Sequence, residues 1–171
     1  MRPTSEASTT TLTVRSDAFS GGSEMPIEYT AEGQNISPPI AWRDVPPGTE
    51  SVAILAEDLD SPQHAFVHWI VVGLDPQTTE LATGAAADLP DGAMHGTNDF
   101  GNAGWGGPDP RRGPRRHRYV FHVYALDRAL SDEGITKPAL LAAIDGHVLA
   151  EGQLMCTYQL RSSATASQPT P

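Results

Sequence analysis

Cysteine is nearly absent from this sequence. Cys156 is the only one among 171 residues, so the chain can form neither an internal disulfide nor a zinc site built from several cysteines. A hydrophobic core must therefore hold the fold, and a single domain of this length can bury one. Cys156 itself lies in a strand-like run and shows no sequence sign of reactivity.

Positive charge is also scarce. Eleven Lys and Arg stand against 21 Asp and Glu, which gives a net charge of −10. Such a surface repels phosphate backbones, so we expect no nucleic-acid partner. No apolar run is long enough to cross a bilayer, so we expect no stable membrane insertion. The N-terminal MRPTSEASTT lacks the apolar centre of a secretory signal, and we therefore expect a cytoplasmic protein.

What the sequence does have is turn-forming residues and short apolar runs. Sixteen Gly and 15 Pro, with 19% charged residues, are typical of a loop-rich, mostly β protein. Residues 1–10 and 162–171 are small and polar, so we expect two disordered tails around one domain of residues 11–161. Five runs bounded by Pro or Gly predict strands. The predicted strands cover residues 11–15, 51–58, 66–74, 118–126 and 152–160.

One helix is predicted near the C-terminus. Thr136 is a suitable N-cap and Pro138 fits the first turn, while Gly152 is a suitable end. The predicted apolar stripe consists of Leu140, Leu141, Ile144 and Val148. Residues 75–117 form a long turn-rich segment, and its aromatic residues favour an ordered, functional loop.

The stretch AEDLDSPQHAFVHW, residues 56–69, places titratable groups at the end of a predicted strand. In an extended chain Asp58 and Asp60 project to the same side. A proline then ends the strand, and the chain returns carrying His68. His117 begins a later strand, directly after the turn-rich segment. Two carboxylates and two imidazoles can therefore converge, with the loop as a wall.

Three kinds of site fit such a group. A metal site would use carboxylate and imidazole ligands, but no element presents two histidines at ligand spacing. An acid/base site needs the same residue types in a pocket, but no G-x-S-x-G nucleophile motif occurs. Neither a P-loop nor G-x-G-x-x-G occurs either. We therefore expect no metal, no cofactor and no catalytic residue, and favour the third kind, a non-enzymatic pocket for an anion.

Each of these residues also has a structural alternative. The two aspartates suit a solvated turn, His68 suits a core position, and His117 suits an ordinary surface. The arginines of residues 111–118, five of the eleven basic residues, can simply offset negative charge. The remaining histidines favour structural or solvent-facing roles, and they are His64, His95, His122 and His147.

Five segments together resemble one known family. They are NISPPIAWRDVPPGTESVAI (35–54), EDLDSPQHAFVHWIVVGL (57–74), TNDFGNAGWGGPDP (97–110), HRYVFHVYALD (117–127) and GHVLAEGQLMCTYQ (146–159). The asparagine-x-serine-proline stretch, the aspartate run followed by histidine-tryptophan, and the glycine-proline-x-proline loop occur in the order found in phosphatidylethanolamine-binding proteins. These are also called Raf kinase inhibitor-like proteins. The sequence is most similar to their bacterial branch.

The resemblance implies a β-sandwich of two antiparallel sheets with one C-terminal helix, long ordered loops and a small pocket. In this family the pocket binds anionic groups such as phosphate, phosphorylated headgroups or acetate. Imidazoles and loop N–H groups would donate to the anion, and the aspartates would orient the imidazoles or meet a ligand ammonium. Carried over, the pocket residues are Asp58, Asp60, His68, His117, Gly107, Pro108, Pro110 and Tyr119.

The sequence departs from the family at three places. Leu59 replaces the proline usual between the two aspartates, and Trp105 stands where tyrosine is frequent. The proline-rich rim that the family has before the segment HRYVFHVYALD is here RRGPRR, residues 111–116. The added positive charge would favour larger or more highly charged anions.

The leading hypothesis is a binding protein for a phosphate-type or other anionic small ligand. One alternative is a regulatory protein that inhibits a kinase or a protease through its surface, and the resemblance also implies a homodimer. A second alternative is an acid/base enzyme with His68 or His117 as base and an aspartate as its partner. The candidate patch for a protein partner is Arg111, Arg112, Arg115 and Arg116.

Overall fold

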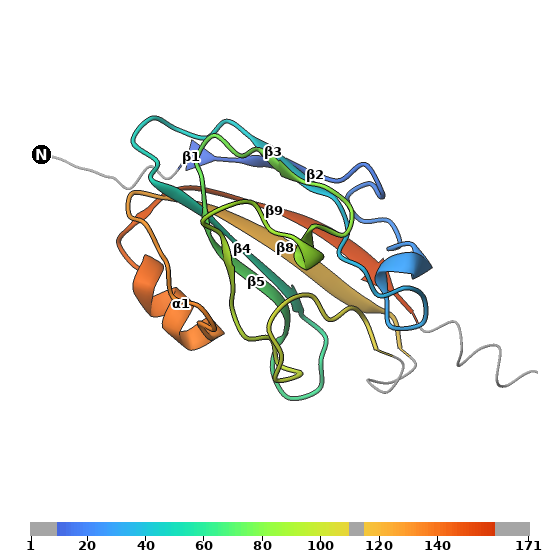
Figure 1. Ribbon diagram of the computed structural model, residues 1–171. Coiled ribbons are helices and arrows are strands. Elements are labelled where there is room, and N and C mark those ends of the chain that lie inside the picture. The colour runs from blue at the N-terminus through green and yellow to red at the C-terminus, as the bar shows by residue number, and fades with distance from the viewer. Residues whose placement is uncertain (1–9, 110–114, 160–171) are drawn as a thin grey trace, which may run out of the picture.

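Two β-sheets lie face to face, and a helix covers the outer side of the larger one (Figure 1). The computed structural model describes residues 10–109 and 115–159. The large sheet has the order β1 (Thr10–Thr11), β9 (Val148–Tyr158), β8 (His117–Leu126), β4 (Ser51–Asp58), β5 (Phe66–Leu74) and β7 (Met94–His95). The small sheet has the order β2 (Thr13–Arg15), β3 (Ile40–Arg43) and β6 (Glu80–Leu81). The helix is α1 (Lys137–Ile144), and two 3-10 turns are η1 (Ile27–Tyr29) and η2 (Ala85–Ala87).

The predicted architecture, a mostly β sandwich with one C-terminal helix, is confirmed. Among the pairs of named strands, only β1 with β9 is parallel, and it spans two residues. The predicted tails fall mainly on residues 1–9 and 160–171, which lie outside the described residues. No helix in the described ranges is long and apolar enough to cross a membrane.

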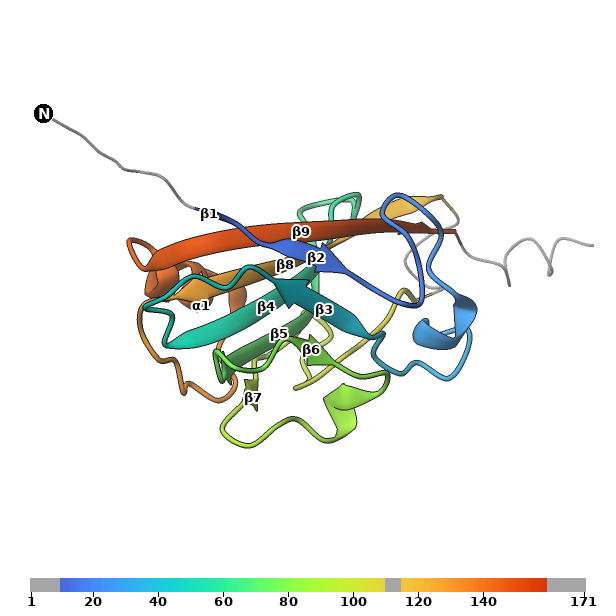
Figure 2. The ribbon, with the colours of Figure 1, turned by 90° about the horizontal axis from the view of Figure 1, so that it is seen from above.

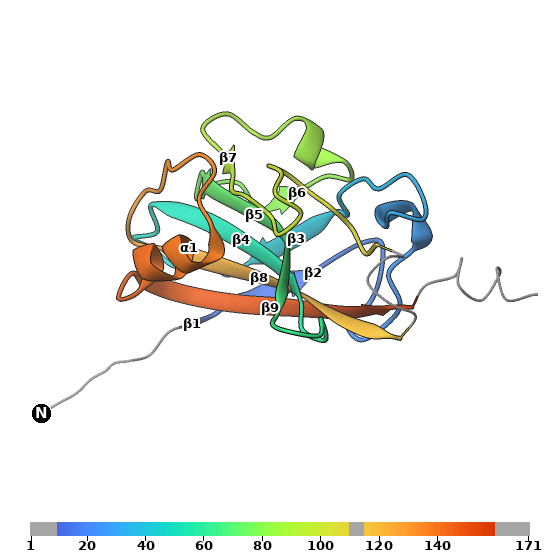
Figure 3. The same cartoon turned by 90° about the horizontal axis from the view of Figure 1, so that it is seen from below.

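The central strands are buried on both faces. All eight residues of β4 are buried. Val52, Ile54 and Ala56 belong to the core between the sheets, whereas Ala53 and Leu55 pack toward α1. Figures 2 and 3 show the small sheet on one side of the large sheet and α1 on the other. This double burial explains why β4 and β5 are continuous apolar runs and not alternating ones.

The helix is shorter than its sequence pattern predicts. It ends at Ile144, and Gly146, with φ of 81°, follows in the left-handed conformation that glycine adopts at low cost. Thr136 occupies the N-cap position, but its side chain makes no capping hydrogen bond. Leu141 is exposed. So short a helix packs its apolar side chains against the large sheet mainly from one face.

The predicted end of the helix at Gly152 is wrong. Val148 and Gly152 both belong to β9. A Cβ on Gly152 would lie 2.2 Å from the carbonyl oxygen of Leu12, so the close approach of the N-terminal strand requires glycine here. The glycine therefore marks a crossing of two backbones in the sheet.

A polar cluster joins α1 to the outer face of the large sheet. Glu57 is 7% exposed; it accepts hydrogen bonds from Lys137 Nζ at 2.5 Å and from His122 Nε2 at 2.9 Å. Burial raises the pKa of Glu57, but the hydrogen bonds from His122 and Lys137 outweigh it and hold the pKa below its ordinary value. The only lysine in the sequence is thus committed to holding the start of the helix.

Replacing Lys137 with Met removes this charge while keeping an apolar stem. We expect the free energy of unfolding at pH 7 to fall by about 1–3 kcal/mol, because a buried carboxylate loses a charged hydrogen-bond donor. The pKa of Glu57 is lowered on folding. The stabilisation that ionised Glu57 contributes to the fold is therefore fully present above the unfolded pKa of about 4.3, and it is lost as the pH falls through the folded pKa. Urea denaturation should show the deficit of the variant shrinking as the pH is lowered from 7.

The control is Arg15→Met, because Arg15 pairs with Asp17 with side chains that are 60% and 80% exposed. Such an exposed pair contributes little, so this variant should lie close to wild type at every pH. Equal losses in the two variants would contradict a special role for the Glu57 cluster.

Candidate functional site

The ends of four strands meet at one end of the large sheet. Because β4, β5, β8 and β9 are antiparallel neighbours, the last residue of β4, Asp58, comes to lie beside the first residues of β5 and β8 and the last of β9. Figure 1 shows α1 near the opposite end. This end of the sheet therefore brings together side chains that are far apart in the sequence.

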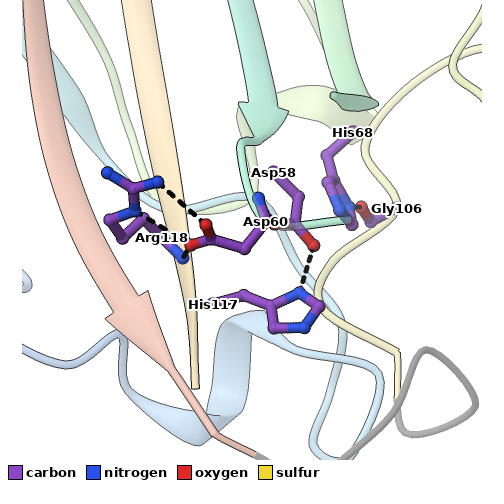
Figure 4. Close-up of polar contacts among 6 residues, drawn as sticks. All are labelled: Asp58, Asp60, His68, Gly106, His117 and Arg118. Atoms are coloured by element: carbon purple, nitrogen blue, oxygen red, sulfur yellow. Dashed lines mark hydrogen bonds and ion pairs between the residues drawn. The ribbon is translucent and has the colours of Figure 1, made fainter. Parts of the chain in front are cut away.

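Asp58 and His117 form a buried pair at this end. Their exposed fractions are 1% and 5%, and Nδ1 of His117 lies 2.6 Å from Oδ2 of Asp58 (Figure 4). The other carboxylate oxygen accepts the backbone N–H of Asp60 at 2.8 Å. Because a carboxylate only accepts, Nδ1 of His117 is the donor. The neutral ring then carries its lone pair on Nε2, and only the protonated ring donates from that nitrogen.

His68 is anchored in the same way but by a carbonyl. Its Nδ1 lies 2.5 Å from the carbonyl oxygen of Gly106, and the residue is 1% exposed. Aromatic rings surround the imidazole, with centroids between 5.2 and 6.3 Å away. These rings belong to Phe66, Phe100, Trp105 and Tyr119. His68 is therefore both a packed core residue and a neighbour of the Asp58–His117 pair.

Tyr119 links the two imidazoles. Its ring centroid lies 5.4 Å from that of His68 and 6.4 Å from that of His117. The register explains this position, because Tyr119 pairs directly with Asp58 across β4 and β8. The side chains of His117 and Tyr119 are two residues apart on one strand and so share a face.

Asp60 lies beside the buried pair, but its carboxylate is bound by Arg118 and not by an imidazole. Its carboxylate accepts from Nε, Nη2 and the backbone N–H of Arg118, at 2.9, 2.8 and 2.8 Å. The hydrogen bond from the Arg118 side chain holds the pKa of Asp60 at about 2. β4 ends at Asp58, so Leu59 already belongs to the turn, and the alternation that would put both aspartates on one side stops there. Of the two, Asp58 contacts an imidazole and Asp60 forms an ion pair.

The loop of residues 97–109 is fastened by hydrogen bonds to the segment after η1. Gly107 N–H donates to Oδ1 of Asn35 at 2.8 Å, and Pro108 accepts from the N–H of Ala31 at 2.8 Å. A Cβ on Gly107 would lie 2.2 Å from the carbonyl oxygen of Tyr29. Glycine is therefore required where the loop meets the segment after η1. Pro110, the remaining predicted wall residue, lies outside the described residues.

Trp105 is tied to the same segment. Its indole N–H donates to the carbonyl oxygen of Tyr29 at 3.1 Å, and its ring stacks on Phe121 with centroids 5.9 Å apart. A tyrosine at this position would present a hydroxyl, whereas the indole presents a donor only. Trp105 therefore fastens the loop to the segment that contains Tyr29.

Sequence reasoning missed a third carboxylate at this end, Glu32. Tyr158, 1% exposed, donates its hydroxyl to Oε1 of Glu32 at 2.6 Å. Tyr158 pairs with His117 across β8 and β9. The two residues of the hydrogen bond are 126 positions apart, and no local motif announces such a contact. In the sequence, only the strand alternation indicated that Tyr158 points inward, on the same face as Cys156.

The other histidines have ordinary structural surroundings. His64 is exposed, as expected. His95, expected to face solvent, is half-buried; its Nδ1 accepts from the indole of Trp69 at 3.3 Å and its Nε2 donates to Ala86 O at 2.8 Å. His147 forms an exposed pair with Asp127. In the part of the chain that the structure describes, no group of three or more His, Cys, Asp or Glu is placed to hold a metal ion.

An open groove of about 470 Å³ lies beside His117. We call it the arginine groove, and its lining residues are Asp60, Arg115, Arg116, His117, Arg118 and Thr157. Two of the four predicted partner-binding arginines, Arg115 and Arg116, thus lie next to the site. Arg111 and Arg112 fall outside the described residues.

Comparison with known proteins assigns the chain to a family. Residues 15–159 match the family model "Phosphatidylethanolamine-binding protein". This chain belongs to the phosphatidylethanolamine-binding protein family. A UPF0098 protein of Methanothermobacter thermautotrophicus is 39% identical over 151 residues, and one of Chlamydia trachomatis is 41% identical over 154 residues. Each alignment covers 86% of this chain and 99% of the relative.

Solved structures of this family have the same fold. A phosphatidylethanolamine-binding protein homologue from Chlamydia trachomatis is 39% identical, with a TM-score of 0.80. YbcL of E. coli, a new member of the mammalian family, is 30% identical, also with a TM-score of 0.80. Both matches cover 88% of this chain and 99% of the other. The family resemblance of the sequence is confirmed. Of the segments that carry it, residues 57–74 run from the end of β4 through β5, and residues 117–127 contain β8.

Gly107→Ala tests how firmly the loop of residues 97–109 is held against the segment after η1. We expect the variant to lose about 1–3 kcal/mol of unfolding free energy, because the new methyl group overlaps a backbone oxygen and the loop must move. Gly21→Ala is the control, since a Cβ there meets only the side chain of Leu154 at 3.6 Å. Urea denaturation of both variants measures the difference. Equal stability of the two variants would show that the loop moves easily and is not held in place at Gly107.

Proposed function

We propose that this protein binds a small anionic ligand of the phosphate type at the Asp58–His117 end of the sandwich. The observation that carries this proposal is the buried contact of 2.6 Å between the carboxylate and the imidazole. A buried carboxylate is costly unless its oxygens are bonded, and here both oxygens are used. The pair holds one imidazole rigidly while leaving its Nε2 available to a ligand.

The direction of the hydrogen bonds determines which ligands suit the site. His117 donates from Nδ1 to Asp58, so its Nε2 donates to an anion only when the ring is protonated. When the ring of His117 is protonated, the carboxylate of Asp58 balances its positive charge, and an anion can then bind at Nε2. An anion without protons, such as sulfate, can bind only that form, whereas phosphate carrying a proton can also donate to the neutral ring.

The family supports the phosphate type of ligand. Its name describes proteins that bind phosphatidylethanolamine, whose headgroup contains a phosphate. The aromatic rings packed around His68 leave that imidazole little freedom to move beside the Asp58–His117 pair.

Calorimetric titration with sulfate and with phosphate, at pH 6 and pH 8, tests the proposal. Sulfate can accept a hydrogen bond from Nε2 of His117 only when the ring is protonated, because Nδ1 already donates to Asp58. We therefore expect sulfate to bind more weakly at pH 8 than at pH 6, and phosphate binding to weaken less. In His117→Asn we expect both to be lost.

The matched control is His147→Asn, because His147 also donates Nδ1 to an aspartate, at 2.8 Å, but on an exposed surface. It should bind like wild type. Thermal unfolding followed by circular dichroism establishes that His117→Asn is folded, and Asp58→Asn provides a second variant of the pair. The proposal falls if wild type binds neither anion at pH 6, or if the His117 and His147 variants behave alike.

The same pair also supports a second candidate, an acid/base enzyme. A carboxylate that fixes the tautomer of a histidine leaves the lone pair of Nε2 ready to take a proton. The two candidates differ in the form of the ring they need. An enzyme base acts as the neutral imidazole and gains activity with rising pH, whereas the anion site uses the cation and weakens.

Covalent chemistry at Cys156 is disfavoured by its surroundings. Burial raises the pKa of this thiol to about 12, and the thiolate is the reactive form. We expect the folded protein to react with a thiol-specific disulfide reagent at pH 8 far more slowly than the protein in urea. Absorbance of the released thiolate measures both rates, and since Cys156 is the only cysteine no other residue contributes. Equal rates would contradict this.

A further inference from the structure

The arginine groove has the size of a ligand site and not of a single ion. Its volume of about 470 Å³ lies in the range of small-molecule pockets. His117 lines it, and the same ring binds the buried Asp58. A ligand in contact with Nε2 of His117 can therefore extend along the groove.

The charges of the groove are not all paired. Asp60 and Arg118 neutralise each other through a two-point contact of guanidinium and carboxylate. Arg116 donates to the uncharged hydroxyl of Thr157 at 3.4 Å. Within the described residues, no carboxylate forms an ion pair with Arg115 or Arg116. Two exposed guanidinium groups therefore remain to give the groove a net positive charge.

This charge is opposite to that of the whole molecule. The chain carries a net charge of −10, yet two unpaired arginines face one groove next to the candidate site. Guanidinium groups bind phosphate and carboxylate through paired N–H donors, and they are always charged. A local positive groove on an acidic protein attracts anions that the rest of the surface repels.

We propose that the ligand carries two neighbouring anionic groups, one phosphate at His117 and a second phosphate or carboxylate on Arg115 and Arg116. This rests on the proposed function and narrows it to a class of ligand. A phosphate paired with an ammonium, as in an ethanolamine headgroup, places a cation where the groove is positive. The groove therefore selects against that headgroup and for the doubly anionic molecule.

Calorimetry at pH 6.5 and constant ionic strength compares four probes. They are phosphate, phosphoethanolamine, phosphoglycolate and pyrophosphate. We expect one or both of the last two to bind about tenfold tighter than phosphate, which corresponds to one additional charge-assisted contact. Phosphoglycolate and pyrophosphate distinguish a second carboxylate from a second phosphate. Phosphoethanolamine should bind no tighter than phosphate.

The variant Arg115→Gln/Arg116→Gln should abolish the tighter binding of the doubly anionic probes. Phosphate affinity should change by no more than about threefold, since salt screens an exposed charge that phosphate does not contact. The control is Arg15→Gln/Arg43→Gln, which removes the same charge from exposed positions on the small sheet. It should keep the full gain.

The outcomes separate this inference from the proposed function. If phosphate binds and the doubly anionic probes bind no tighter, the second subsite is refuted and the anion site stands. If the groove variant and its control lose the gain equally, general attraction accounts for it and the subsite is again refuted. If no probe binds wild type, both proposals fall together.

Discussion

The hydrogen bond between Asp58 and His117 is the constraint on which this end of the molecule depends. A carboxylate that is 1% exposed must be bonded at both oxygens or it destabilises the fold. Its partners are the ring of His117 and the backbone of Asp60. The two bonds of this carboxylate tie the end of β4 to the first residue of β8 and to the turn that follows β4. The position of the imidazole is thus part of folding.

The last two residues of β4 are both buried carboxylates that need hydrogen-bond partners, and they point to opposite faces of the sheet. Asp58 faces the end of the core between the sheets and meets His117, whereas Glu57 faces α1 and meets His122 and Lys137. Strand alternation imposes this division. A strand buried on both faces has no solvent side for a carboxylate, so each one needs a partner from another element. One short strand thereby connects the site to the helix.

The sequence predicted most of the fold because double burial leaves a strong signal. The predicted strands 51–58 and 66–74 coincide with β4 and β5. The helix end was misplaced because Val148 fits a helical stripe and a strand equally well, and the packing of Leu12 against Gly152 decides between them. Alternation did not reveal that Asp60 pairs with Arg118, since it ceases where the strand stops. The bond of Tyr158 to Glu32 joins positions too distant for any local pattern.

The use of the single lysine has a consequence for chemical labelling. Lys137 is the only side-chain amine in the sequence, and it is held against Glu57 at 2.5 Å. An amine in an ion pair is a poor nucleophile, so acylating reagents react with it mainly when its contact with Glu57 opens. The rate of side-chain acylation therefore reports on the opening of the ion pair that joins the start of α1 to the sheet. The sequence thus offers a single labelling site for that contact.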